Sequence, residues 1–127
     1  MEYVRGTETI LLVEDEELLR KLVSEFLTQI GYDVISASNA RDAMILAQNH
    51  PGTIHLLITD VIMPDTSGPE LARNLCAQRH DLKVIYISGF DDGSLAPKGI
   101  LDPGTVLITK PFSVRLLSAK MREVLAE

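Results

Sequence analysis

The chain has 127 residues, enough for one domain with a full hydrophobic core. Its net charge of −6, from 12 basic and 18 acidic residues, argues against a surface that binds nucleic acid or an anionic membrane. The single cysteine, Cys76, excludes an intrachain disulfide framework, and no apolar run reaches the length of a membrane span.

The first half of the chain alternates strand patterns with helix patterns after a short polar tail at residues 1–8. Residues 9–13 form a continuous apolar run, which is typical of a strand covered on both faces. Apolar residues then recur at helical spacing until Gly31, and they predict an inward helix face made of Leu19, Leu22, Val23, Phe26, Leu27 and Ile30. A second strand at 32–37 and a helix at 39–49, capped by Asn39, follow.

The second half continues the alternation with a third strand at 54–59. Loop residues follow it, and Pro69 opens a helix that runs to about residue 77. The remaining predicted elements are strands at 83–87 and 105–108 and a final helix at 113–125. This order predicts one α/β domain over residues 9–127, in which helices cover both faces of a parallel sheet.

One crossover departs from the pattern, at residues 91–104. Topology calls for a fourth helix there, yet two glycines and an interior proline fall in its helical part. A proline inside a helix costs about 3 kcal/mol and a glycine about 1 kcal/mol. We therefore predict a short, irregular or mobile helix.

Charged and polar residues stand at the carboxyl ends of the predicted strands. Glu14 and Asp15 follow the first strand, Asp60 the third, Ser88 the fourth and Lys110 the fifth. Ligands of open parallel sheets bind at these ends, and a strand order of 2-1-3-4-5 brings the three carboxylates together. Such carboxylates repel one another unless they are protonated or bridged by a cation, and oxygen ligands without His or Cys select Mg²⁺.

A divalent ion, a lysine and a hydroxyl around a carboxylate make a site for phosphoryl transfer. Asp60 can act as the nucleophile, while Mg²⁺ and Lys110 neutralise the phosphoryl oxygens and Ser88 donates a hydrogen bond to them. Glu16 and Glu17 have a simpler interpretation as acids favoured at the N-terminus of a helix.

These residues resemble the motifs of response-regulator receiver domains of two-component signalling over residues 9–126. The resemblance rests on Glu14-Asp15, Asp60 with Met63-Pro64 and Ser67-Gly68, Ser88-Gly89, and Lys110-Pro111-Phe112. It implies a flavodoxin-like (CheY-like) doubly wound sheet of five parallel strands in the order 2-1-3-4-5. The run Tyr86-Ile87-Ser88-Gly89-Phe90 and residues 101–104 further resemble receivers at the C-terminus of hybrid sensor kinases.

The resemblance also implies a role for each site residue. Asp60 is the phosphoacceptor, Ser88 the hydroxyl switch and Lys110 the phosphate clamp. Asp15, Asp60 and the backbone carbonyl of Ile62 are expected to bind Mg²⁺ directly, and Glu14 through a water molecule. Many receivers carry an aromatic residue on the fifth strand that moves on phosphorylation, but this chain has Leu107 there, which has no ring to follow the movement of the hydroxyl.

The resemblance implies a phosphorelay step in which the chain catalyses its own phosphorylation and slow dephosphorylation, without turnover of a metabolite. The expected donor is a sensor histidine kinase or a histidine phosphotransfer protein, and a parent hybrid kinase is a further candidate partner. Because residues 1–9 lack the apolar core of a signal peptide, we expect a cytoplasmic domain without membrane contact. The alternatives are a Mg²⁺-dependent phosphohydrolase with an aspartyl-phosphate intermediate and a receiver that binds partners without accepting phosphate.

Overall fold

A computed structural model of the chain describes residues 6–89 and 106–126. Within them, parallel strands form one five-stranded sheet in the order β2-β1-β3-β4-β5, as predicted. The strands are β1 (Thr9–Val13), β2 (Asp33–Ala37), β3 (Leu56–Asp60), β4 (Lys83–Ser88) and β5 (Val106–Thr109). The helices are α1 (Glu17–Gln29), α2 (Ala40–Asn49), α3 (Gly68–Gln78) and α4 (Val114–Leu125). The predicted irregular crossover at 91–104 lies outside the described residues.

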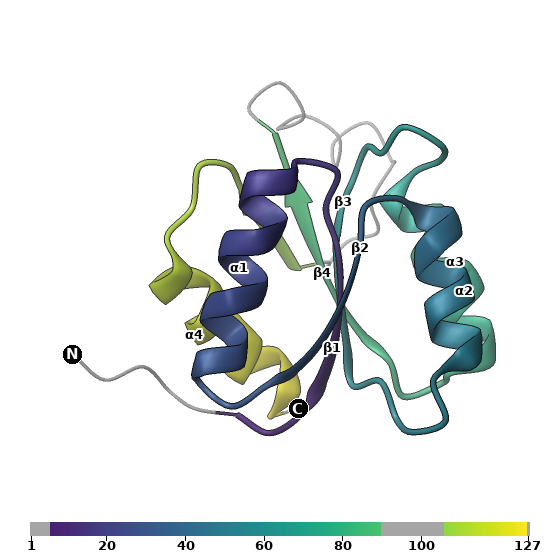
Figure 1. Cartoon of the computed structure of the whole chain (residues 1–127), viewed down its shortest axis with the longest axis horizontal. Helices are drawn as coiled ribbons and strands as arrows, with labels where there is room; N and C mark the ends of the chain where they lie inside the picture. The colour runs from purple at the N-terminus through teal and green to yellow at the C-terminus, as the bar shows by residue number, and fades with distance from the viewer. Residues whose placement is uncertain (1–5, 90–105, 127) are drawn as a thin grey trace.

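Helices cover both faces of the sheet, α1 and α4 on one side and α2 and α3 on the other (Figure 1). Alternate residues of β1 point to opposite faces, so Ile10 and Leu12 pack toward α1 and α4 while Leu11 and Val13 pack toward α2 and α3. This explains why β1 and β3 read as continuous apolar runs rather than alternating ones. None of the helices in these two ranges is long and apolar enough to cross a membrane.

The register of the central strands positions the functional end of the sheet. Val13 of β1 lies beside Thr59 of β3, so the residues that follow, Glu14 and Asp60, leave the sheet next to each other. The structure begins β3 two residues later than predicted and includes Asp60 in it. Asp60 is therefore held by strand pairing, opposite Ile87 of β4.

The predicted inward face of α1 is wrong at one position. Val23 and Leu27 are buried, but the side chain of Leu22 is 58% exposed, and Leu18 is 84% exposed. Helical spacing places Leu18 and Leu22 one turn apart on the same stripe. The helix therefore carries these two leucines as an exposed apolar stripe, of which the periodicity had assigned only Leu22 to the inward face.

Residues 6–8, which the sequence placed in a tail, contact the domain. Gly6 donates a backbone hydrogen bond to Ile30, and Glu8 forms a two-pronged ion pair with Arg122 of α4. The hydrogen bonds from Arg122 lower the pKa of Glu8 to about 2. The division of the chain into a tail at 1–8 and a domain from residue 9 stays a prediction.

Gly31 offers a test of the fold, because its φ of +110° is a conformation that L side chains rarely adopt. A Cβ there would lie 2.2 Å from the carbonyl oxygen of Gly6. We expect Gly31→Ala to lower the free energy of unfolding by about 1–3 kcal/mol, measured by chemical denaturation.

Gly52→Ala is the matched control, since the nearest atom to its added Cβ is 3.4 Å away, in the side chain of His50. This variant should change the free energy of unfolding by less than about 0.5 kcal/mol. Equal stability of the two variants would contradict the close approach of Gly31 to Gly6.

Candidate functional site

Three carboxylates meet at the carboxyl ends of β1 and β3. Glu14 and Asp15 follow β1 and Asp60 ends β3, and one carboxylate oxygen from each lies within 4.8 Å of the others. Glu14 is 1% exposed and Asp60 4% exposed, whereas Asp15 faces solvent. The structure thus brings together the acids that the sequence predicted to converge.

Lys110, which follows β5, places its ammonium against this cluster. Its Nζ lies 3.0 Å from Oε1 of Glu14 and 3.3 Å from Oδ1 of Asp60. The backbone amide of Lys110 donates to the carbonyl of Ser88, which fixes β5 against the end of β4, and the Lys110–Pro111 peptide bond is cis. The structure thus places Lys110 beside Asp60, as the sequence predicted.

Burial and crowding decide how these groups hold protons. Burial, followed by the neighbouring Glu14 and Asp15, raises the pKa of Asp60 to about 9, and Lys110 offsets only part of this effect. Burial acts to raise the pKa of Asp15 too, but its interactions with Asp60 and Glu14 outweigh this, so its pKa is lowered. Burial also opposes the charge of Lys110, yet its bonds to Glu16 and Glu14 raise its pKa above the usual value. The cluster therefore favours a proton, or another cation, at Asp60.

The same cluster contains buried oxygen atoms without well-formed hydrogen bonds. Among the described residues, these are Oε1 of Glu14 and both carboxylate oxygens of Asp60. The ammonium of Lys110 is within ion-pair distance of two of them, so the ion pairs compensate charge without completing the hydrogen bonding. Buried oxygens of this kind, with no nitrogen or sulfur donor in the cluster, fit a hard divalent cation such as Mg²⁺.

The other predicted site residues are Ser88, at the end of β4, and Ile62, in the loop after β3. Ser88 is fully buried at the end of β4, and its hydroxyl donates to the carbonyl of Gly89. Ile62, two residues beyond Asp60, has an exposed side chain and pairs with Ser67 in an isolated β-bridge. Leu107 lies beside Tyr86 and packs against the core on the α2 and α3 side. The roles assigned to Ser88 and Ile62 stay predictions.

The loop after Asp60 is fastened by contacts that the sequence reading missed. The carboxylate of Asp65 accepts hydrogen bonds from the backbone amides of Ala40 and Arg41, at 3.2 and 3.0 Å. It therefore caps the N-terminus of α2 from a distant loop. At the other end of the loop, the amide of Gly68 donates to Val61 at 2.7 Å, and a Cβ at Gly68 would lie 2.1 Å from the carbonyl oxygen of Asp60.

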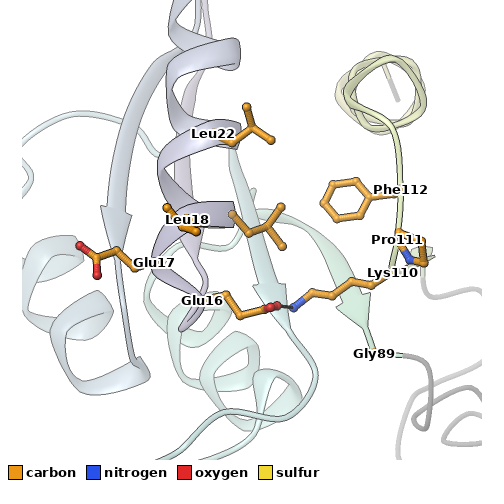
Figure 2. A pocket seen from close by; sticks show the side chains of 9 residues that line it. Glu16, Glu17, Leu18, Leu22, Gly89, Lys110, Pro111 and Phe112 are labelled. Atoms are coloured by element: carbon orange, nitrogen blue, oxygen red, sulfur yellow. Dashed lines mark hydrogen bonds and ion pairs between the residues drawn. The ribbon is translucent and has the colours of Figure 1, made fainter.

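Glu16 also contacts the site, although its place in the sequence indicates only a helix N-terminal acid. The structure places Glu16 just before α1, where its carboxylate accepts a hydrogen bond from the ammonium of Lys110. Figure 2 shows the two side chains extended toward each other, at one end of an apolar groove of about 910 Å³. The apolar part of this groove is formed by Leu18, Leu19, Leu22, Pro111 and Phe112. Only the position of Glu16 directly after Asp15 signalled its closeness to the site.

The sequence of the chain is similar to those of known proteins. The sequence model of the response regulator receiver domain matches residues 10–122. The response regulator receiver protein CpdR of Brucella abortus is 34% identical over 116 residues, which are 91% of this chain and 95% of CpdR. The sensor kinase CckA of Brucella abortus is 32% identical over 120 residues, and there the match covers 94% of this chain but only 13% of the kinase.

Solved structures show the same similarity. The receiver domain of the hybrid histidine kinase CckA superposes with a TM-score of 0.76 and 31% identity, over 92% of this chain and 98% of that domain. The response regulator TrrA of Thermotoga maritima, solved in complex with Mg²⁺ and BeF, gives a TM-score of 0.75 and 28% identity over 93% of this chain and 99% of TrrA.

The raised pKa of Asp60 predicts how the free energy of unfolding depends on pH. The ordinary pKa of an Asp is 3.8, and burial beside Glu14 and Asp15 raises the pKa of Asp60 in the folded protein to about 9. Unfolding between these values releases a proton, so the free energy of unfolding falls as the pH rises. We expect Asp60→Asn, without divalent cations at about pH 8, to raise the free energy of unfolding by about 1–3 kcal/mol.

Denaturation curves at about pH 5 and pH 8 measure this difference, which should grow with pH and shrink when Mg²⁺ stabilises the wild type. Asp33→Asn, the same change at an exposed position in β2, is the control and should have little effect. If Asp60→Asn is no more stable than Asp33→Asn at either pH, the buried charge of Asp60 is compensated in the wild type.

Proposed function

The chain belongs to the response regulator receiver domain family, and from this we propose that Asp60 accepts a phosphoryl group from a phosphohistidine of a signalling partner. The observation that carries the proposal is the position of Asp60: a buried carboxylate at the end of a strand, between an acidic pair and the ammonium of Lys110. Burying several acidic groups together costs free energy unless a cation compensates their charge. The surroundings of Asp60 therefore do not serve to stabilise the fold.

The proposed reaction forms one bond and breaks another. A carboxylate oxygen of Asp60 attacks the phosphorus, the P–N bond to the donor imidazole breaks, and the donor histidine keeps the electron pair and takes up a proton. Lys110 can stabilise the negative charge on the phosphoryl oxygens, because its ammonium is already 3.3 Å from Asp60. Hydrolysis by water then returns Asp60 to a carboxylate and releases inorganic phosphate.

We include Mg²⁺ in the proposal. Asp15, Asp60 and the carbonyl of Ile62 would hold it directly and Glu14 through water, which the unsatisfied oxygens of Glu14 and Asp60 support. When bound, the ion supplies positive charge that lets several carboxylates and a phosphoryl group share one site. The Mg²⁺ in the TrrA complex supports this choice of ion by similarity.

Partners are proposed from the relatives. A sensor histidine kinase or a histidine phosphotransfer protein is the donor, in keeping with the similarity to the receiver of the hybrid kinase CckA. That similarity also supports a place for this chain within a hybrid kinase in the cytoplasm. The apolar groove beside Lys110 gives a donor protein a surface to pack against while its histidine reaches Asp60.

The phosphohydrolase alternative is not favoured. A metabolite phosphatase needs a pocket that holds its substrate against the nucleophile, but the large groove here is lined mainly by apolar residues of α1 and by Phe112.

Labelling with acetyl phosphate and Mg²⁺ tests the proposal. We expect the wild type to take up close to one phosphoryl group per chain, as a mass increase that hydroxylamine removes, because an acyl phosphate is cleaved by that nucleophile. Asp60→Asn should take up none, since an amide cannot form the acyl phosphate. Chelation of Mg²⁺ should slow labelling of the wild type by more than about tenfold.

Intact-protein mass spectrometry measures the label, and Asp33→Asn serves as the folded control that should label like the wild type. Sustained release of phosphate far beyond one equivalent, from acetyl phosphate and from metabolite phosphates, would favour the phosphohydrolase. A wild type that labels no more than Asp60→Asn would instead identify a binding-only receiver.

A further inference from the structure

Lys110 is bound by more acidic groups than its proposed role requires. Its ammonium contacts Glu14 and Asp60 in the buried cluster and a third carboxylate, that of Glu16, outside it. The side chains of Glu14 and Asp60 are 2% and 6% exposed, but that of Glu16 is 60% exposed. Glu16 therefore holds the ammonium from the solvent side, at the end of the groove seen in Figure 2.

The contacts of Glu16 indicate that its carboxylate serves mainly to bind Lys110. It precedes α1 at the N-cap but makes no side-chain cap hydrogen bond, so it does not stabilise the helix in that way. Its backbone amide donates to Oε2 of Glu14, which fixes Glu16 next to the buried acid. The backbone thus presents Glu16 to Lys110, and the ion pair is the contact that its side chain makes among those described.

A phosphoryl group on Asp60 changes the balance around Lys110. It brings about two negative charges to Asp60, together with oxygen atoms that compete for the same ammonium. If Lys110 turns toward them, it gives up Glu16. If it stays, the phosphoryl group forms beside an extra carboxylate. In either case Glu16 opposes the modification electrostatically.

We propose that Glu16 restrains phosphorylation by competing with the phosphoryl group for the ammonium of Lys110. Glu16 is a positioning residue here, because it acts through Lys110 and does not touch the reacting atoms. When Asp60 is phosphorylated, Lys110 moves to the phosphoryl oxygens and the Glu16 carboxylate is released to solvent beside Leu18 and Phe112. This inference rests on the proposed phosphorylation of Asp60.

Glu17 provides a matched control. It is the next residue, it carries the same charge and it also borders the groove, but its side chain points away from Lys110 in Figure 2. Glu16→Gln and Glu17→Gln change the net charge of the chain equally. A general electrostatic effect on an anionic donor therefore appears in both variants, and competition for Lys110 appears only in the first.

The experiment measures the rate of Asp60 phosphorylation against acetyl phosphate concentration at saturating Mg²⁺. We expect Glu16→Gln to react about three- to tenfold faster than the wild type, as the loss of one partly exposed ion pair allows, and Glu17→Gln to change by less than about twofold. In the unphosphorylated proteins, the NMR signal of the Lys110 ε-methylene should shift in Glu16→Gln and stay in place in Glu17→Gln.

Equal rates for the two variants, a slower Glu16→Gln, or an unmoved Lys110 signal would each overturn the inference. Those results leave the proposed function intact provided that the wild type labels and Asp60→Asn does not. If the wild type fails to label, the proposed function fails and the inference fails with it. Thermal denaturation of both variants checks that a rate difference does not come from partial unfolding.

Discussion

The structure depends on buried negative charge at one end of its sheet. Parallel pairing of β1 and β3 places Glu14 beside Asp60, and both side chains are almost fully buried. Such a pair is unstable unless a proton or a cation compensates it. Lys110 supplies one positive charge, which leaves the cluster short of cations. This shortage of positive charge suits the site to the divalent ion and the phosphoryl group that we propose for it.

Much of this arrangement could be predicted because it follows from local patterns. Continuous apolar runs identified the buried strands, and the charged residues at their ends marked one edge of a parallel sheet. The convergence of Glu14, Asp15 and Asp60 then required only the strand order, which the family resemblance supplied. Ion pairing of Lys110 with Asp60 followed from the same order, since every group involved lies at a strand end.

The missed features depend on where individual side chains point. Leu22 fits the periodicity of the buried face, yet it stands on the side of α1 that borders the groove. Asp65 looked like an ordinary turn residue, but it caps a helix 24 and 25 residues away in the sequence. Glu16 looked like a helix-terminal acid, although its partner is 94 residues away. Contacts over such separations are set by tertiary packing, and helical periodicity and cap preferences carry no information about it.

The two sides of the site differ in how firmly they are held. On the α2 side, the loop after Asp60 is fixed by two backbone amides bound to Asp65 and by the close approach of Gly68 to the strand. On the α1 side, Lys110 is held partly by Glu16, in an ion pair exposed enough to be worth about 1 kcal/mol or less. A change of charge at Asp60 therefore moves the weaker side first. Leu107 has no ring to turn inward, and it stays packed beside Tyr86. The exchange proposed at Lys110 and Glu16 takes place in the groove that the exposed stripe of α1 also lines.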